Sequence, residues 1–307
     1  MSREGIGFPP LRIDRGEGES ILAGTQGEIL RVDEFGGAIG VSCKPFPATC
    51  VDGAYLEDRW VGVWLDREFG ECRMAALPLE DGLLEGASRE SLRLTTNSRE
   101  GLHPAGSIWS RTLDYEPMKM GISGESLVFT TKSGMYMVDK EAREIWREEL
   151  PHWPEISREG ISDRVVGVEG VPGGVVIFSQ AGGVSVIDPS NGSTIYSRIL
   201  NIRDRVSKVC YSEENGWMIL LHSNSVIILE KIEGEPSLIE TPGPVLDAES
   251  LEDEWRWTGW RHDGRISGDR MLEIVNMDGI GVGILGGLVL TNDGHWRKFG
   301  WDNDSSL

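Results

Sequence analysis

The chain has 307 residues, 39% hydrophobic and 26% charged, a composition that excludes an intrinsically disordered protein. Fifty acidic residues against 30 basic ones give a formal charge of −20, and no run of Lys or Arg concentrates the cations, so nucleic-acid binding is disfavoured. The N-terminal segment lacks an apolar core after a basic start, and no stretch of about 18 apolar residues follows, so we expect neither a signal peptide nor a membrane span.

Four cysteines are spread along the chain without the spacing of a metal site. Cys43, Cys50, Cys72 and Cys210 form no C-x-x-C pair, and the five histidines do not cluster near them. Few cysteines in a long chain are typical of a reducing compartment. We therefore expect a cytoplasmic protein without a metal or other cofactor.

A recurring pattern of short strands and turns runs along the chain. Its clearest copy spans Gly174 to Leu200, where an alternating strand ends at Asp188 and Gly192 follows four residues later. The acid can accept hydrogen bonds from backbone amides two residues on, and the glycine can supply a positive φ. The same markers occur, in chain order, at Asp33 and Gly37, at Asp66 and Gly70, at Asp139 (followed by Arg143 in place of glycine), and at Glu230 and Gly234.

Two weaker copies extend the pattern. One lies at Leu92 to Leu102, with Asn97 and Gly101, and the other at Ile284 to Trp301, with Asp293. The seven markers between residues 33 and 293 have a mean spacing of about 43 residues, the length of a four-stranded propeller blade. A sheet that is apolar on both faces must stack against neighbouring sheets to bury them.

The pattern therefore predicts an all-β fold: a single β-propeller over residues 1–307 with about seven four-stranded blades, six or eight staying open. We expect the N-terminal segment Leu11 to Ile13 to complete the last blade. The C-terminal segment Arg297 to Trp301 is the alternative.

Two of the copies resemble a known repeat. Met135 to Asp139 with Trp146, and Ile187 to Tyr196 with Tyr in the Trp position, are similar to the repeat of pyrroloquinoline-quinone-type (PQQ-like) propellers, and more generally to WD40-like propellers. The resemblance implies that Trp146 packs between neighbouring blades. Quinoprotein dehydrogenases of that family bind a quinone and calcium beside a vicinal disulfide, and this chain has no adjacent cysteines. The resemblance therefore implies a propeller and not that activity.

The candidate binding residues form one dense cluster. Trp255, Trp257, Trp260, Arg261 and His262 follow the acidic run from Asp247 to Glu254. Tryptophan and arginine dominate the energy of buried interfaces, and tryptophan can also stack on a sugar or a base. The alternative is a strand with Trp255 and Trp257 on one face, packed in the core, and with Trp260 in a turn.

No residue pattern in the chain forms a catalytic signature. His262 and Asp263 are neighbours, but no further ligands or nucleophile motif accompany them, so we expect neither a general base nor a metal site there. We expect a non-enzymatic scaffold that binds another protein, as a subunit of a larger complex. A binder of a small molecule or carbohydrate, or an enzyme acting on one, with its site in the central pocket of the propeller, is the alternative.

Overall fold

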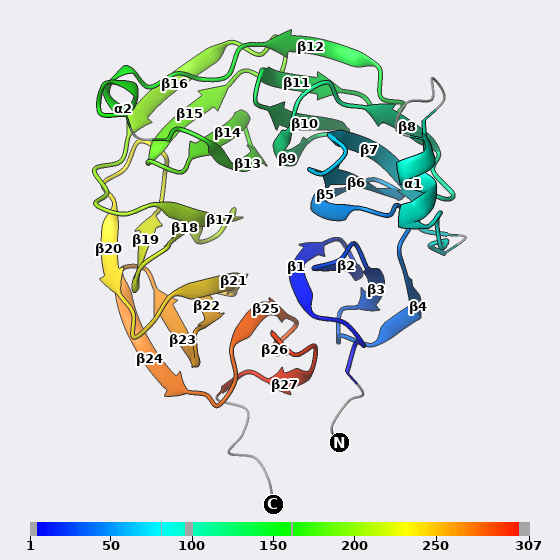
Figure 1. Ribbon diagram of the computed structural model, residues 1–307. Coiled ribbons are helices and arrows are strands. Elements are labelled where there is room, and N and C mark those ends of the chain that lie inside the picture. Colours follow the sequence, from blue (N-terminus) through cyan, green and yellow to red (C-terminus); the bar gives the residue numbers. More distant parts are fainter. Residues whose placement is uncertain (1–4, 81, 96–100, 161, 301–307) are drawn as a thin grey trace, which may run out of the picture. The chain divides into compact units, whose positions relative to one another are not determined.

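The computed structural model describes residues 5–80, 82–95, 101–160 and 162–300 (Figure 1). These residues form 27 β-strands and two short helices, α1 (Arg89–Thr95) and α2 (Pro154–Arg158). The all-β prediction is confirmed. Neither of the described helices is long and apolar enough to cross a membrane.

The strands form seven antiparallel sheets, which we number in chain order and which fall into two compact units. The first unit in the chain is made of residues 6–150 and 189–192 and holds sheets 1 to 3. Its strands are β1 (Pro10–Arg15), β2 (Glu19–Gly24), β3 (Ile29–Asp33) and β4 (Ala38–Cys43) in sheet 1; β5 (Thr49–Leu56), β6 (Arg59–Asp66), β7 (Glu71–Pro78) and β8 (Trp109–Thr112) in sheet 2; and β9 (Pro117–Ser123), β10 (Ser126–Thr131), β11 (Gly134–Val138) and β12 (Glu144–Glu148) in sheet 3.

The other unit is made of residues 1–5, 151–188 and 193–307 and holds sheets 4 to 7. Sheet 7 has three strands among the described residues. The strands are β13 (Val165–Val171), β14 (Gly174–Ser179), β15 (Gly183–Ile187) and β16 (Thr194–Ile199) in sheet 4; β17 (Val206–Ser212), β18 (Gly216–Leu221), β19 (Ser225–Leu229) and β20 (Ser237–Glu240) in sheet 5; β21 (Val245–Leu251), β22 (Glu254–Gly259), β23 (His262–Ser267) and β24 (Arg270–Asn276) in sheet 6; and β25 (Gly281–Leu285), β26 (Leu288–Thr291) and β27 (Trp296–Lys298) in sheet 7.

The core of each unit lies between neighbouring sheets. All residues of the second strands β14 and β18 are buried, which explains their unbroken apolar runs, because both faces of a middle strand are covered. Phe178 and Trp217, one from each of these strands, pack 5.0 Å apart between ring centroids. Within each unit, the first strand of a sheet contacts the first strand of the next sheet. The first strands therefore form the inner layer of each stack.

The acidic markers hold turns through their own carboxylates. Oδ1 of three markers accepts backbone N–H hydrogen bonds of 2.7 to 3.0 Å. The donors lie two and then three or four residues after the acid: Phe35 and Gly37 after Asp33, Glu68 and Phe69 after Asp66, and Glu141 and Arg143 after Asp139.

The positive φ expected of the marker glycines is found at only some of them. Gly70 and Gly192 have φ of 68° and 79°, but in the first copy Gly36 (73°) takes this conformation instead of Gly37. Gly37 directly precedes β4 and closes the turn, since its carbonyl accepts the N–H of Asp33. In the Asp139 copy, Ala142, which precedes Arg143, has the positive φ. Gly234 does not have a positive φ.

One of the seven predicted copies does not match a sheet of its own, and one sheet has no predicted copy. Leu92 to Leu102 is not a hairpin, because α1 covers its first part within a long connection of sheet 2; Asn97 lies outside the described residues. Sheet 6, between Glu230 and Asp293, has no marker in the pattern. The pattern thus counts sheet 2 twice and sheet 6 not at all, and the two errors cancel.

The prediction for the N-terminal segment is wrong. Leu11 to Ile13 lies in β1, which pairs with β2 in sheet 1, so it does not complete the last sheet. Its hydrophobic residues fit an inner strand of either sheet, and the pairing partner decides between them. Of the C-terminal alternative, Arg297 and Lys298 lie in β27, the third strand of sheet 7.

Candidate functional site

The tryptophan cluster is divided between the core and the surface. Trp255 and Trp257 alternate on β22 and are 2% and 0% exposed, so neither ring can meet an external partner in this conformation. Trp260 follows the strand, in the turn toward β23, and is 55% exposed. Of the two interpretations of this segment, the placement fits a core strand followed by a turn.

The turn itself is held by local hydrogen bonds. Trp260 N donates to the carbonyl of Pro244, and Arg261 adopts a φ of 65°, a conformation that non-glycine residues adopt mainly in tight turns. His262 Nδ1 lies 2.9 Å from the carbonyl oxygen of Trp260. Arg261 and His262 therefore shape this turn, and Trp260 is the one ring of the cluster that it presents to solvent.

Asp263, the neighbour of His262, has a structural role. Its carboxylate is fully buried and accepts hydrogen bonds from the Thr258 hydroxyl, from both terminal nitrogens of Arg297 and from the Gly300 N–H. These donors occupy both oxygens of the carboxylate. They tie sheet 6 to sheet 7, and no oxygen is left directed at a substrate.

A repeated feature that the sequence analysis missed lies in the first strand of every sheet. The pairing register with the second strand shifts near the first residue of the first strand in all seven sheets, as in a β-bulge. The residues at which pairing resumes after the shift are Arg12, Asp52, Met120, Gly167, Lys208, Asp247 and Gly283. Four of the seven sheets thus place a charge at this position, and in sheet 3 Lys119 directly precedes it.

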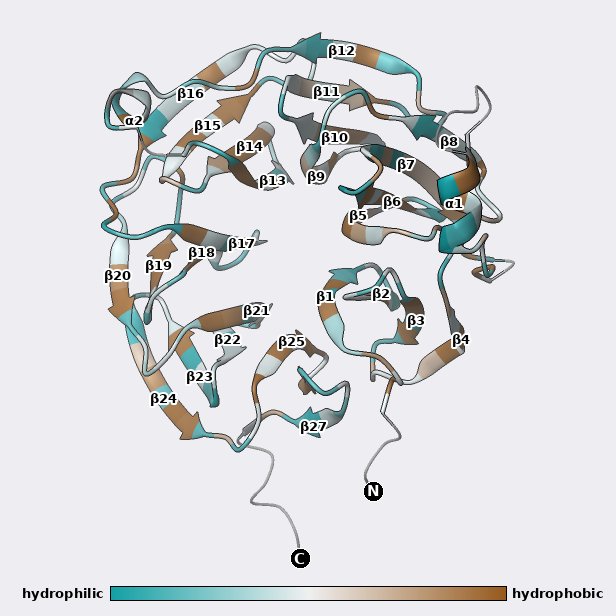
Figure 2. Cartoon of the chain, in the orientation of Figure 1, coloured by the Kyte–Doolittle hydropathy of each residue, from teal (hydrophilic) through white to brown (hydrophobic). Residues whose placement is uncertain are grey.

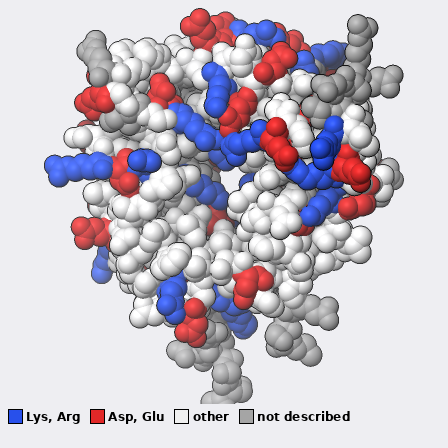
Figure 3. Space-filling view, viewed as in Figure 1, with Lys and Arg blue, Asp and Glu red and all other residues white. Residues whose placement is uncertain are grey.

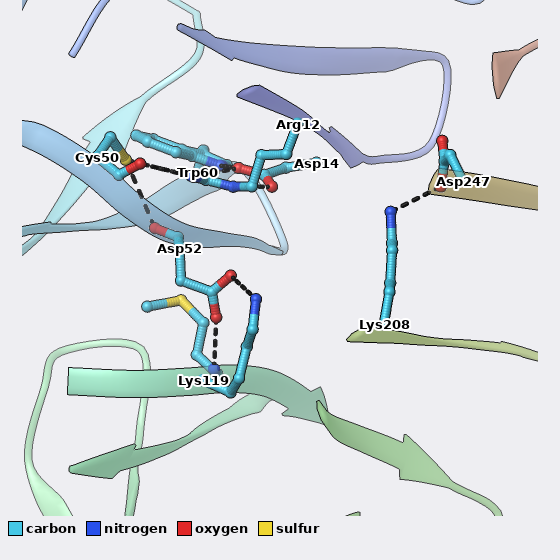
Figure 4. A network of polar contacts seen from close by, with 9 residues as sticks. Arg12, Asp14, Cys50, Asp52, Trp60, Lys119, Lys208 and Asp247 are labelled. Carbon is cyan, nitrogen blue, oxygen red and sulfur yellow. Dashed lines mark hydrogen bonds and ion pairs between the residues drawn. The ribbon is translucent and has the colours of Figure 1, made fainter. Parts of the chain in front are cut away.

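The two aspartates at this position make similar bonds. Asp52 Oδ2 accepts from the N–H of Met120 at 2.8 Å, and Asp247 Oδ2 accepts from the N–H of Ile284 at 2.9 Å, in each case in the next sheet. The other oxygen of each binds a lysine ammonium, that of Lys119 in the next sheet at 3.1 Å and that of Lys208 in the preceding sheet at 2.6 Å (Figure 4). The sequence shows an aspartate within each of these two strands but does not show its partners in other sheets.

A second buried network lies between sheets 1 and 2. Both carboxylate oxygens of Asp14 accept hydrogen bonds. Arg12 donates to Oδ1 and Oδ2, and the indole of Trp60 donates to Oδ2 at 3.1 Å. Burial opposes the charge of Arg12, but the carboxylate of Asp14 more than offsets this, so the pKa of Arg12 lies above its ordinary value. Arg12 also reaches the sulfur and carbonyl of Cys50.

The cysteine in this network is an unreactive thiol. Burial raises the pKa of Cys50 to about 11, although Arg12 acts in the opposite direction. Burial likewise raises the pKa of Cys43 to about 12, with the carboxylate of Glu85 adding to the effect. A protonated thiol is a poor nucleophile, so neither cysteine is prepared for covalent chemistry. Among the described residues, no three His, Cys, Asp or Glu side chains are placed to hold a metal ion.

One cleft of about 430 Å³ opens in the first unit. It lies between the β2–β3 turn, the connection from β4 to β5 and the segment before α1, with Lys44, Glu85 and Arg89 among its lining residues. These charges are already engaged. Lys44 pairs with Glu28 at 3.0 Å, its N–H donates to Glu85, and Arg89 pairs with Asp66 and Glu68. Burial by itself would raise the pKa of Glu28. Hydrogen bonds, including the one from Lys44, act in the opposite direction, and the net result is a pKa below the ordinary value.

The outermost strands carry the exposed apolar side chains. Large hydrophobic residues that are at least 36% exposed lie on the fourth strands of five sheets: Ile39 and Val41 on β4, Ile145 on β12, Ile195 on β16, Leu238 on β20, and Leu272 and Ile274 on β24. Figure 2 shows that β12, β20 and β24 each contain both hydrophobic and hydrophilic residues. Single exposed hydrophobic residues are ordinary, but their recurrence on the same strand of successive sheets is a pattern.

Comparison with solved structures identifies the fold. The chain is similar to the β-propeller domain of Cps50 (Swd1) from Myceliophteria thermophila (TM-score 0.67, 9% identity, 98% of each chain covered) and to the WD40 β-propeller domain of Doa1 (0.64, 8%, 100% of this chain and 98% of that one). It is also similar to BamB from Moraxella catarrhalis (0.59, 10%, 93% and 83%). The fold is a seven-bladed β-propeller.

The predicted propeller of PQQ-like or WD40-like type is thereby confirmed, and sheets 1 to 7 are its blades. At these identities the likeness shows the fold alone. No protein-family description matches the sequence, and no curated protein does. The Trp position implied by the resemblance is occupied as expected in blade 3, where Trp146 is buried and its indole donates to the carbonyl of Pro189 at 2.9 Å.

Proposed function

We propose that this protein is a non-enzymatic scaffold that binds another protein through the outer strands of its blades. The observation that carries the proposal is the distribution of side chains across each blade. Exposed apolar residues recur on the fourth strands, whereas the carboxylates of the inner strands are bonded to neighbouring strands. Exposed apolar surface promotes binding to other proteins. Carboxylates that are hydrogen-bonded within the protein are not available to bind or activate a substrate.

The four cysteines support a cytoplasmic location for this function. Cys43, Cys50, Cys72 and Cys210 are all buried free thiols. Free thiols persist in a reducing compartment, whereas secreted proteins generally pair theirs. We propose that the scaffold acts in the cytoplasm, with a protein partner and without a cofactor.

Affinity purification of the tagged full chain from its own cells tests the proposal. We expect one or more proteins in stoichiometric amount by quantitative mass spectrometry, absent from a purification with the tag alone. Proteins that accompany the chain should also be cross-linked to at least one fourth strand when a photoreactive amino acid is placed on these strands one at a time, for example at Val41, Ile145 or Leu238. A chain that purifies alone, and that a small metabolite stabilises in a thermal-shift screen, would contradict a scaffold function.

A further inference from the structure

Strand β4 differs from the other fourth strands in having no charge. Among the fourth strands that the structure describes, all the others contain Lys, Arg, Asp or Glu: Arg111 in β8; Glu144, Arg147 and Glu148 in β12; Arg198 in β16; Glu240 in β20; and Arg270 and Glu273 in β24. Charged residues on an edge strand prevent it from pairing with another chain. The sequence of β4, Ala38 to Cys43, lacks this protection.

The exposure of β4 is also the greatest. Its first five residues are all exposed, and Val41, at 80%, is the most exposed large hydrophobic side chain in the described part of the chain. Ile39 is 36% exposed and Phe35, in the preceding turn, is 57% exposed. The three side chains lie within seven residues of the sequence. We call this exposed apolar segment the β4 ridge.

A bulge interrupts the pairing of β4 with β3 within the β4 ridge. Arg31 pairs with Ile39 and Ile29 pairs with Cys43, so the three residues between Ile39 and Cys43 face a single residue of β3. Gly40, at the start of this bulge, has a φ of 85°. In addition, β4 is the edge strand of sheet 1, so no other strand of the sheet pairs with its outer side. An edge of this kind offers both backbone hydrogen bonds and an apolar anchor.

We propose that the β4 ridge is the docking site for an extended apolar segment of another protein, flanked by Lys or Arg. The proposal rests on the scaffold function and names the edge that binds and the chemistry of the partner. An extended segment can satisfy the free backbone groups of β4 while its side chains contact Ile39 and Val41.

The charges around the ridge require cationic flanks. The turn before β4 carries Glu34, which is exposed, and at the other end the charge of Lys44 is neutralised by Glu28. The chain as a whole has a formal charge of −20. Opposite charges increase the rate of association and exclude acidic competitors. Figure 3 shows that Lys and Arg over α1 and β9 to β11 lie beside Asp and Glu, so these cations do not form a separate basic surface on that face.

A second copy of this chain fits the ridge less well. Antiparallel self-pairing of β4 would bring the bulge of one copy against the bulge of the other, because the bulge lies in the middle of the strand. Each copy also carries the same charge of −20, which opposes self-association. A different protein avoids both obstacles.

Selection from a displayed library of random 12-residue peptides tests the proposal. The full chain is the target, Val41→Lys is the variant, and Ile145→Lys on β12 is the matched control, since Ile145 is an exposed side chain on another fourth strand. Both variants should fold, which circular dichroism checks. We expect enriched peptides with alternating apolar residues and Lys or Arg flanks. Their affinity, measured by fluorescence anisotropy, should be at least tenfold weaker for Val41→Lys and unchanged for Ile145→Lys.

Three outcomes would overturn the proposal. Selected peptides could bind Val41→Lys as tightly as the unmodified chain, or no peptide could be enriched. Light scattering could also show a dimer that Val41→Lys dissociates, which would assign the ridge to a second copy. The affinity purification separates these failures from a failure of the scaffold function. A stoichiometric partner that Val41→Lys retains overturns only the ridge, whereas a chain without any partner overturns both.

Discussion

The first and the fourth strands of the blades differ in which side chains they bury and which they expose. On the first strands, charged residues such as Asp52 and Asp247 are buried and bonded to a neighbouring blade. On the fourth strands, apolar residues such as Val41 and Ile145 are exposed. Some side chains of the fourth strands also bond to the next blade, as Trp146 of β12 and Arg198 of β16 do. The exposed apolar side chains make no such bond, so they are the part of the fourth strands that is available for the binding proposed above.

The largest expected effect is the loss of an inner tie. Asp247→Ala removes the buried carboxylate that accepts the Ile284 N–H and binds the Lys208 ammonium, and should lower the free energy of unfolding by about 3 kcal/mol. Asp253→Ala, at an exposed turn of the same blade, is the control and should change it by less than about 0.5 kcal/mol. Urea denaturation measures both. Equal unfolding free energies of the two variants would contradict a greater contribution of the buried Asp247 bonds to stability.

The next effect comes from close packing around the second network. A Cβ on Gly53 would lie 2.4 Å from Asp14 Oδ2 and 2.5 Å from the ring of Trp60, so Gly53→Ala should destabilise the chain by about 1–3 kcal/mol. Gly279→Ala is the control, because the nearest atom to its Cβ would be 3.6 Å away. Thermal unfolding of the two variants compares them. A melting temperature of Gly53→Ala at or above that of Gly279→Ala would contradict the packing described.

A buried ion pair in blade 6 should make stability depend on pH. Burial by itself would raise the pKa of Glu254. The hydrogen bonds from Arg265 and Arg256 act in the opposite direction, and the net result is a pKa below the ordinary value of 4.5. A carboxylate whose pKa is lowered by folding stabilises the folded state above its unfolded pKa, and this contribution is lost as the pH falls through the folded pKa. Glu254→Gln should therefore be less stable than the unmodified chain at pH 7, by about 1–2 kcal/mol.

Urea titrations of both proteins between pH 7 and pH 3 check this expectation. The difference in unfolding free energy should shrink as the pH falls below 4.5. A difference that stays constant over this range would show that the pair does not carry the pH dependence.

The smallest effect on stability is expected at the outer strands. Val41→Lys and Ile145→Lys replace exposed side chains, so each should change the unfolding free energy by less than about 0.5 kcal/mol. The same urea titrations measure this. A loss above about 2 kcal/mol in either variant would mean that the outer strands also hold the fold together.

The fold class was predictable from sequence because hairpin turns and alternating strands are local features. The Asp139 turn is an example, since its carboxylate binds amides two and four residues on. The assignment of blades failed where local features mislead. Sheet 6 has no acid–glycine marker, and α1 interrupts the long connection of sheet 2 where a hairpin was expected.

The candidate site was less predictable, because it depends on contacts between distant residues. The bond from Asp52 to Met120 joins residues 68 positions apart, and no local pattern reports it. Alternation did separate Trp255 and Trp257, which share a face, from Trp260 in the turn. Val41 lies within a bulge, which the sequence does not show, whereas the absence of charge in β4 is visible in the sequence.

Hydrogen–deuterium exchange of the full chain, with and without a selected peptide, tests the division between inner and outer strands most directly. We predict that the peptide slows exchange of the amides in Ala38 to Cys43 and leaves those of β12, β20 and the first strands unchanged. Protection on the first strands, or on another fourth strand in place of β4, would contradict the division and the docking site.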